Sequence, residues 1–338
     1  MSNEVVLSVK NLSVVFHTPD GDVAAVNDVS FDLRSGETLG IVGESGSGKS
    51  VTASSIMRLN NSVTASTSGS ILISGVDILT ADESDVRRVR GSEVAMIFQD
   101  PLSALNPYYT VGKQIAEAYL VHHPHVAKSE ARAVTLEMLK KVGIPNPEKR
   151  IDEFPHQFSG GMRQRIVIAI ALINNPKVLI ADEPTTALDV TVQAQILDLM
   201  KELQAEFNMA IVLITHDLGV IAEAAKDLLV MYGGRVVERS TVEALFSEPT
   251  HPYAWGLLGA VNSLSSSGRG ALATIAGSPP SLIALPSGCS FNPRCAYASD
   301  VCRTEVPLLR PIGLQGSVTA CHLPDVEILS IGQGVASR

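Results

Sequence analysis

The stretch TLGIVGESGSGKS, residues 38–50, constrains the fold more than any other part of this 338-residue chain. Gly43, Gly48, Lys49 and Ser50 match the pattern G-x-x-x-x-G-K-[ST]. The apolar run TLGIV precedes this loop, and an apolar-periodic segment follows it. We therefore expect a buried strand, a phosphate-binding loop (P-loop) and a helix, which is the repeating unit of an α/β fold with a parallel sheet.

The residue types in this loop suit a nucleotide phosphate. Glycines let the backbone curl so that successive N–H groups point at phosphate oxygens, and the N-terminus of the next helix adds partial positive charge. We expect Lys49 to contact the β- and γ-phosphates and the Ser50 hydroxyl to bind Mg²⁺. The loop residues expected to contact nucleotide are Gly43, Ser45, Gly46, Gly48, Lys49, Ser50 and Val51. The alternative is a glycine- and serine-rich linker, and the flanking strand and helix patterns argue against it.

Two carboxylates follow a second apolar strand in KVLIADEP, residues 177–184. A fully apolar run is typical of a parallel strand covered on both faces, and ligands bind at the carboxyl ends of such strands. We expect Asp182 to hold Mg²⁺ and Glu183 to orient or deprotonate an attacking water. Two solvated acids before a proline turn are the alternative interpretation.

A third strand, AIVLITHDL at residues 210–218, carries His216 at its end. A polar strand cap is the simpler explanation of this histidine. The strand nevertheless ends at the same sheet edge as the carboxylates, which favours a contact between His216 and a γ-phosphate.

A second glycine-rich loop occurs in FPHQFSGGMRQRIVIAIAL, residues 154–172. Ser159, Gly160 and Gly161 come just before an apolar helix, so their backbone N–H groups suit an anion. This loop lies about 110 residues after the first. One nucleotide cannot easily use both loops within one compact lobe, so we expect a head-to-tail dimer in which each second loop closes on the partner's ATP.

Taken in order, these motifs resemble those of the ATP-binding-cassette (ABC) ATPases. The resemblance implies a P-loop (RecA-like) α/β core with a small antiparallel β subdomain and a helical subdomain. It implies that Gln99, in MIFQDPLSALNP, senses the γ-phosphate and contributes to the Mg²⁺ site, and that Asp189, in TALD, organises the dimer seam. It implies that Phe16 stacks on adenine, although an ordinary strand core residue also fits that position. The sequence FSGGM departs from the family's commoner LSGGQ at Phe158 and Met162.

The motifs IVGESGSGKS, FSGGMRQR, ADEPTTALDVTVQAQIL, ITHDLGVIAE and HPYAWGLL, with the cysteine tail, look like those of ATPase subunits of bacterial dipeptide and oligopeptide importers. That resemblance implies a second ABC ATPase, identical or a paralogue, two transmembrane permease subunits and a periplasmic or extracellular solute-binding protein. It implies a peripheral position on the cytoplasmic face of the bacterial inner membrane. Another solute, such as nickel, a sugar, an opine or a peptide-like antibiotic, remains an alternative cargo, and a soluble non-transport ABC ATPase is a more distant one.

Composition agrees with these expectations. The net charge of −9 is a poor match for binding a nucleic-acid backbone, which needs clustered Lys and Arg. No apolar stretch of about 18 residues is present to span a membrane. The chain also has no basic-then-apolar start, so we expect no signal peptide.

The expected domains are an ATPase domain at residues 1–240, with its helical subdomain at about 100–165, and an irregular accessory domain at 241–338. The accessory domain holds every cysteine of the chain, namely Cys289, Cys295, Cys302 and Cys321. A reducing cytoplasm disfavours disulfides, and structural zinc usually uses closer pairs of cysteines. Irregularly spaced thiolates can hold a [4Fe–4S] cluster, and the importer resemblance implies one. Zinc, with His322 replacing one thiolate, and unliganded thiols stay open.

Overall fold

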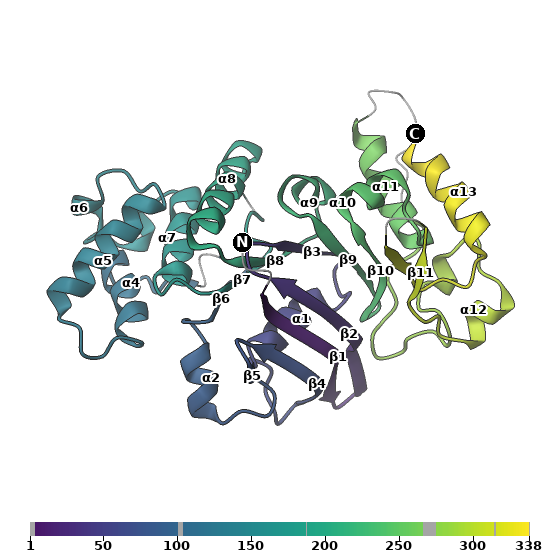
Figure 1. Cartoon of the computed structure of the whole chain (residues 1–338), viewed down its shortest axis with the longest axis horizontal. Coiled ribbons are helices and arrows are strands. Elements are labelled where there is room, and N and C mark those ends of the chain that lie inside the picture. The colour runs from purple at the N-terminus through teal and green to yellow at the C-terminus, as the bar shows by residue number, and fades with distance from the viewer. Residues whose placement is uncertain (1–3, 101–103, 187, 266–274, 314–315, 338) are drawn as a thin grey trace. The chain divides into compact units, whose positions relative to one another are not determined.

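The computed structural model describes residues 4–100, 104–186, 188–265, 275–313 and 316–337 (Figure 1). Contacts divide the chain into two compact units. The first unit is Met1–Ser8, Asp32–Glu37 and Ile71–Leu213, and the second unit is Val9–Phe31, Thr38–Ser70 and Ile214–Arg338.

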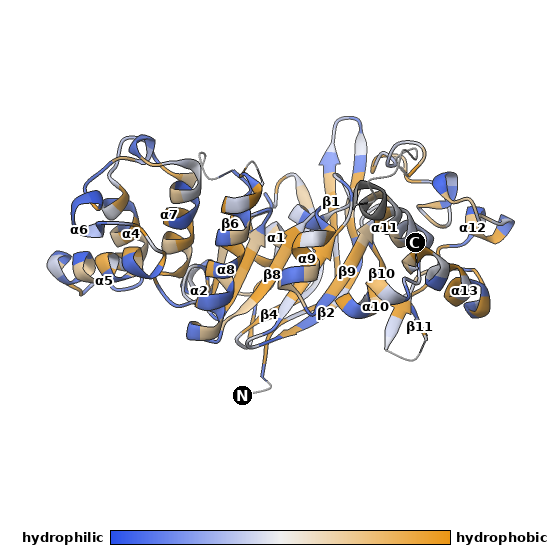
Figure 2. Cartoon of the chain, turned by 90° about the horizontal axis from the view of Figure 1, so that it is seen from above, coloured by the Kyte–Doolittle hydropathy of each residue, from blue (hydrophilic) through white to orange (hydrophobic). Residues whose placement is uncertain are grey.

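The strand, loop and helix expected from the first motif are present in the second unit. Strand β3 (Thr38–Val42) is buried along its whole length, and helix α1 (Lys49–Ile56) follows the loop. Strand β9 (Asp227–Tyr232) pairs in parallel with β3, and β10 (Arg235–Thr241) pairs antiparallel with β9. The predicted parallel pairing is therefore present between β3 and β9. The apolar residues of β9 account for its orange colour in Figure 2.

The C-terminal region adds strands to this same part of the sheet. Strand β12 (Ser317–Thr319) pairs with β10, and β11 (Arg310–Ile312) pairs with β12, both antiparallel. The strand order in this unit is therefore β11-β12-β10-β9-β3. The helices of the region are α9 (Leu218–Ala224), α10 (Val242–Ser247), α11 (Pro252–Ser265), α12 (Asp300–Thr304) and α13 (Asp325–Ala336), with a short 3₁₀ turn at Asn292–Arg294.

Long N-terminal strands form the expected small antiparallel β subdomain. Strands β1 (Val5–Thr18), β2 (Gly21–Arg34) and β4 (Ala65–Ile73) lie in the order β2-β1-β4. Buried residues alternate with more exposed ones along much of each strand, as expected when only one face is covered. In the first unit, β5 (Val76–Asp77) pairs antiparallel with the end of β4.

The first unit carries the second predicted strand. Strand β7 (Val178–Asp182) is fully buried and pairs in parallel with β6 (Val94–Ile97). Strand β8 (Ala210–Thr215) begins in this unit and lies on the other side of β7. Helices α2 (Glu83–Val89) and α8 (Val190–Phe207) belong to the same unit.

A group of helices between β6 and β7 corresponds to the expected helical subdomain. It contains α4 (Val111–Leu120), α5 (Lys128–Lys141), α6 (Pro147–Arg150), a 3₁₀ turn at Pro155–Gln157, and α7 (Gly160–Leu172). Helices α4, α5 and α7 contact one another. Among the described residues, no helix combines the length and the apolar character needed to cross a membrane.

Candidate functional site

Two glycines of the P-loop adopt backbone conformations that other residues rarely adopt. Gly43 and Gly48 have φ angles of +155° and +100°, and a Cβ there would approach the carbonyl oxygens of Met231 and Ala25 to 2.3 Å and 2.4 Å. No side chain fits at either position without moving backbone, which explains why the motif fixes glycine there.

Lys49 lies inside the loop, where its side chain is almost fully buried. Its Nζ donates to the carbonyl oxygens of Gly43 at 2.7 Å and Glu44 at 2.9 Å. The ammonium group is thus held against the backbone of the loop. Ser45, Gly46 and Ser50 are exposed and Val51 is half-buried, so the loop presents polar groups to solvent.

Phe16 and His216 are the other predicted site residues of the second unit. Phe16 lies near the end of β1 and is half-buried, which fits both a residue that stacks on a ligand and an ordinary strand core residue. His216 directly follows β8 and is exposed.

Asp182 ends strand β7 in the first unit, as expected, and Glu183 follows it directly. Asp182 is 5% exposed, whereas Glu183 is half-buried and has a left-handed φ of +49°. The Glu183 carboxylate accepts hydrogen bonds from Gln99 Nε2 at 2.9 Å and Thr186 Oγ1 at 2.8 Å. Backbone strain of this kind in a non-glycine residue clusters at functional sites. The structure therefore brings two predicted residues, Gln99 and Glu183, into direct contact.

Two helices of the first unit begin at predicted site residues. Ser159 is the N-cap of α7, and its hydroxyl accepts from the N–H of Met162. Asp189 is the N-cap of α8, and its carboxylate accepts from the N–H of Val192 at 3.0 Å. Both caps are exposed, so each side chain has a local structural task and remains accessible.

The two glycines after Ser159 differ in their surroundings. Among the residues that the structure describes, a Cβ on Gly160 would meet only Leu188, at 3.7 Å, whereas a Cβ on Gly161 would approach Val192 Cγ1 to 2.5 Å. Gly161 is therefore required where α7 passes close to α8, a packing reason that sequence reasoning missed.

The two departures from LSGGQ also have local partners. Phe158 is buried, and the Arg150 guanidinium lies 5.5 Å from its ring centroid. Arg150 Nη1 also lies 3.7 Å from the Met162 sulfur. The two substituted side chains share Arg150 as a neighbour.

The sequence of this chain is similar to those of known proteins. Residues 26–186 match the ABC transporter family, and residues 237–302 match the C-terminal region of oligopeptide/dipeptide transporters. The oligopeptide transport ATP-binding protein OppD of Escherichia coli is 50% identical over 96% of this chain and 95% of its own length. OppD of Bacillus subtilis is 52% identical, over 87% of this chain and 82% of its own. The dipeptide transport ATP-binding protein DppD of Lactococcus lactis is 51% identical, over 91% and 88%.

This chain belongs to the ATP-binding subunits of oligopeptide and dipeptide ABC transporters. ATP and Mg²⁺ are the cofactors typical of ABC ATPases. A solved dimeric ATP-binding cassette in a post-hydrolysis state, bound to ADP and phosphate, superposes with a TM-score of 0.63 at 27% identity, over 70% of this chain and 98% of that one. The ABC fold with its antiparallel subdomain is thereby confirmed.

The HPYAWGLL motif of this ABC subunit is buried and tied to its surroundings. The His251 side chain is fully buried, and its Nδ1 accepts from the N–H of Tyr253. The Tyr253 hydroxyl accepts the N–H of Glu44 in the P-loop at 2.7 Å. Trp255 Nε1 donates to the Pro249 carbonyl at 2.7 Å. The motif that pointed to the peptide-importer family thus contacts the nucleotide loop, which the sequence did not reveal.

A buried carboxylate holds the start of this motif. Glu238 is fully buried on β10, and its Oε2 accepts the N–H groups of Thr250 and His251 at 3.0 Å and 2.8 Å. Its Oε1 and the hydroxyls of Ser240 and Thr250 have no hydrogen-bond partner among the described residues. Burial raises the pKa of Glu238 to about 7, although the two backbone N–H groups oppose the shift. Burial also lowers the pKa of His251 to about 3.

The four cysteines converge in the structure. They line one small cavity together with His251 and His322; the cysteines are Cys289, Cys295, Cys302 and Cys321. Burial, and less strongly the neighbouring thiols, raise the pKa of Cys289, Cys295 and Cys321 to about 11. Within the described part of the chain, no three side chains of His, Cys, Asp or Glu are placed to hold a metal ion. The cluster of the sequence analysis therefore stays a prediction.

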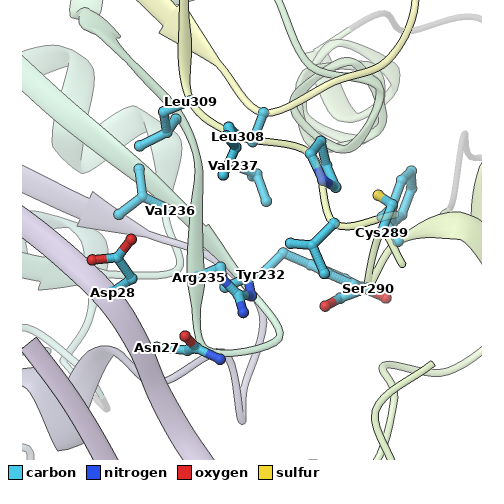
Figure 3. Close-up of a pocket in the computed structure, with 14 residues that line it drawn as sticks. Asn27, Asp28, Tyr232, Arg235, Val236, Val237, Cys289, Ser290, Leu308 and Leu309 are labelled. Atoms are coloured by element: carbon cyan, nitrogen blue, oxygen red, sulfur yellow. The ribbon is translucent and has the colours of Figure 1, made fainter. Parts of the chain in front are cut away.

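A separate cavity of about 320 Å³ lies in the second unit (Figure 3). Asn27, Asp28 and Arg235 form a polar side, and residues 236–237 and 306–309 form an apolar one. Cys289, at its edge, is the residue of this lining that the sequence analysis singled out. The lining residues come from segments that are far apart in the sequence, so no local sequence motif predicts this cavity.

Proposed function

We propose that this chain hydrolyses ATP to drive the uptake of oligopeptides or dipeptides through a membrane complex. The observation that carries the proposal is the match over 96% of the chain to proteins named for peptide transport, together with an intact P-loop. The match at residues 237–302 to a region named for oligopeptide/dipeptide transporters supports a peptide cargo over the other solutes.

Each predicted site residue has a proposed role in this reaction. Ser50, Gln99 and Asp182 bind Mg²⁺, and Glu183 accepts the proton of the water that attacks the γ-phosphate. His216 contacts the γ-phosphate and Phe16 stacks on adenine. The phosphate-binding residues are Gly43, Ser45, Gly46, Gly48, Lys49, Ser50 and Val51, and the residues that act on the partner's ATP are Ser159, Gly160, Gly161 and Asp189. The exposure of His216, Ser159 and Asp189 supports these assignments.

The active form is a dimer with a second ABC ATPase, and we infer that this second subunit is a paralogue. The dimeric cassette among the structural relatives supports dimerisation of the ATPase. Residues 1–240 act as the ATPase domain, with its helical subdomain at about 100–165, and residues 241–338 as an accessory domain.

Helix α4 supplies a surface for the permease subunits. A shallow, largely apolar groove of about 640 Å³ is lined by Tyr109, Lys113, Ala116, Glu117, Leu120, Val121 and Lys128. Tyr108, next to it in sequence, is 85% exposed, and Val121 is 70% exposed. Exposed apolar groups of this kind mark interaction sites. We propose that a cytoplasmic segment of one of the two transmembrane permease subunits binds here, which places the chain peripherally on the cytoplasmic face of the cell membrane, while a solute-binding protein outside delivers the peptide.

The cysteine tail holds a [4Fe–4S] cluster in this proposal, with Cys289, Cys295, Cys302 and Cys321 as ligands and zinc as the alternative. The four cysteines line one small cavity, which supports a shared ligand, and their side chains must shift to bind it, because no three of the described His, Cys, Asp or Glu side chains are placed to hold a metal ion. Burial raises the pKa of Cys289, Cys295 and Cys321, so these free thiols are protonated and a bound metal would have to displace their protons. Iron, sulfide and zinc analysis of anaerobically purified protein tests this: about four irons and four sulfides per chain are expected, and protein that hydrolyses ATP without metal would exclude the cluster.

The transport role is tested by isolating the tagged chain from membranes of its native host and identifying the subunits that copurify. Two integral membrane subunits and a paralogous ATPase are expected. ATP hydrolysis by the isolated complex should increase when a peptide-loaded binding protein is added and stay at its basal rate with nickel or a sugar. Stimulation by one of those solutes instead would reject the peptide cargo.

A further inference from the structure

Arg294 reaches from the cysteine segment, residues 288–302, to the P-loop. Its Nη1 donates to Glu44 Oε2 at 2.6 Å, and its Nη2 donates to Glu44 Oε1 at 3.1 Å. The Arg294 side chain is 5% exposed and the Glu44 side chain is 26% exposed. Glu44 is the second residue of the P-loop, directly after Gly43, so this bidentate ion pair binds the loop itself.

The guanidinium is fully satisfied in this position. Besides the two bonds to Glu44, Nε donates to the Ala276 carbonyl at 2.9 Å, Nη2 to the Ile275 carbonyl at 3.2 Å, and Nη1 to the Tyr232 hydroxyl at 3.3 Å. An arginine has five N–H donors, and each one has an acceptor here. Lysine offers a different geometry and cannot make this set of bonds.

Other contacts hold the cysteine segment and the P-loop in the same arrangement. Phe291 is buried against the rings of Tyr232 and Tyr253, at centroid distances of 5.1 Å and 5.5 Å. The Tyr253 hydroxyl accepts the Glu44 N–H, so both the side chain and the backbone of Glu44 are bound. Pro279 and Pro280 line a small cavity whose other wall is Glu44–Ser47.

We propose that Arg294 is a positioning residue for ATP binding: it holds the P-loop in its phosphate-binding shape and couples that shape to the cysteine segment. The inference rests on the nucleotide-binding role proposed above and adds a regulator of that site. A loop that is held in shape loses less conformational freedom on binding a nucleotide, so removing the contact weakens binding. Arg294 lies between Cys289 and Cys295 in the sequence. A change that moves these cysteines should therefore also move the Arg294 guanidinium relative to Glu44. Coupling is reciprocal, so nucleotide must also stabilise the cysteine segment.

The test compares R294M and R294K with the wild-type full-length chain. R132M is the matched control, because Arg132 in the first unit makes a bidentate ion pair with Asp152, at 2.8 Å and 2.7 Å. The dissociation constant of ADP·Mg²⁺ is measured by calorimetry at a temperature well below unfolding. We expect R294M and R294K to bind about tenfold more weakly than wild type, and R132M to bind within twofold of it.

A double-mutant cycle assigns the effect to Glu44. E44Q combined with R294M should bind within about twofold of R294M alone, because both changes break the same contact. Hydrogen exchange supplies a second readout: ADP·Mg²⁺ should slow exchange of amides in residues 289–296 in wild type by roughly fivefold, and not in R294M.

The outcomes separate this inference from the nucleotide-binding role. Wild-type affinity in R294M, additive losses in the cycle, or unchanged exchange at 289–296 would each overturn the positioning role while leaving ATP binding intact. A wild-type chain that binds no nucleotide would overturn both.

Discussion

The side-chain amide of Gln99 donates to Oε2 of Glu183 at 2.9 Å, and the hydroxyl of Thr186 donates to the same oxygen at 2.8 Å. The two donors fix the direction of a carboxylate whose backbone is already left-handed. Gln99 follows β6 and Glu183 follows β7, so parallel pairing of these strands brings the two residues to one edge. The residue proposed to sense the γ-phosphate and the residue proposed to activate water are thereby linked by one hydrogen bond.

Replacing Glu183 with Gln should separate ATP binding from hydrolysis. Gln keeps the size of the side chain and removes the base, so kcat should fall by roughly 10² to 10⁴ while ATP still binds. Steady-state phosphate release and nucleotide affinity measure the two steps. Asp198→Asn, on the exposed face of α8, is the matched carboxylate-to-amide control and should retain activity. Near-normal turnover in Glu183→Gln would remove Glu183 from this role.

Replacing Lys49 with Ala should abolish useful nucleotide binding. The ammonium group lies inside the P-loop, and losing its charge-assisted bonds to phosphate should raise the dissociation constant on the order of a hundredfold. Lys149→Ala, at an exposed position of α6, is the control. Titration with a fluorescent ATP analogue decides, and unchanged affinity would defeat the P-loop assignment.

Adjacent glycines at the start of α7 should respond oppositely to alanine. Gly161→Ala places a methyl group 2.5 Å from Val192 Cγ1 and should lower the free energy of unfolding by about 1–3 kcal/mol. Gly160→Ala has room and should be neutral or stabilising by up to about 1 kcal/mol. Urea unfolding measures both, and Val192→Ala should restore much of the stability of Gly161→Ala. Equal effects at the two positions would contradict the close approach of α7 to α8.

Stability should depend on pH through Glu238. Its folded-state pKa of about 7 lies above the ordinary value of 4.5, so the folded state holds a proton that the unfolded chain has lost. The contribution of Glu238 is therefore fully present below about pH 4.5 and is lost as the pH rises through 7, by about 3 kcal/mol in all. The lowered pKa of His251 has the opposite effect between about pH 3 and 6.5.

Comparing Glu238→Gln with wild type cancels the histidine contribution. The difference in unfolding free energy, variant minus wild type, should increase by about 3 kcal/mol between pH 4.5 and 7. Gln keeps an oxygen to accept the N–H groups of Thr250 and His251 and has no charge to bury. A difference that stays constant with pH would show that Glu238 does not titrate in this range.

Local patterns in the sequence predicted much of the site. The apolar runs before Gly43 and Asp182 predicted buried strands, and both are present as β3 and β7. Ser159 preceded an apolar helix in the sequence and is the cap of α7. Short-range physics determines these features, because burial and helix capping act within a few residues.

Contacts between distant segments escaped prediction. Arg294 and Glu44 are 250 positions apart, and their pairing depends on how the C-terminal region packs on the P-loop. The convergence of the four cysteines and the need for glycine at position 161 likewise depend on tertiary packing. In each case the residue types could be read from the sequence, whereas the residues that they contact depend on the tertiary structure.

The central claim, that ATP hydrolysis by this chain drives peptide import, is tested most directly by reconstitution. The complete complex, purified with its permease subunits and paralogue, is placed in liposomes with ATP inside and with labelled peptide and binding protein outside. We predict that peptide accumulates in vesicles containing wild-type chain and that accumulation stops with Glu183→Gln. Accumulation that is equal in the two preparations, or absent while wild-type ATP hydrolysis continues at full rate in the presence of peptide, would contradict the claim.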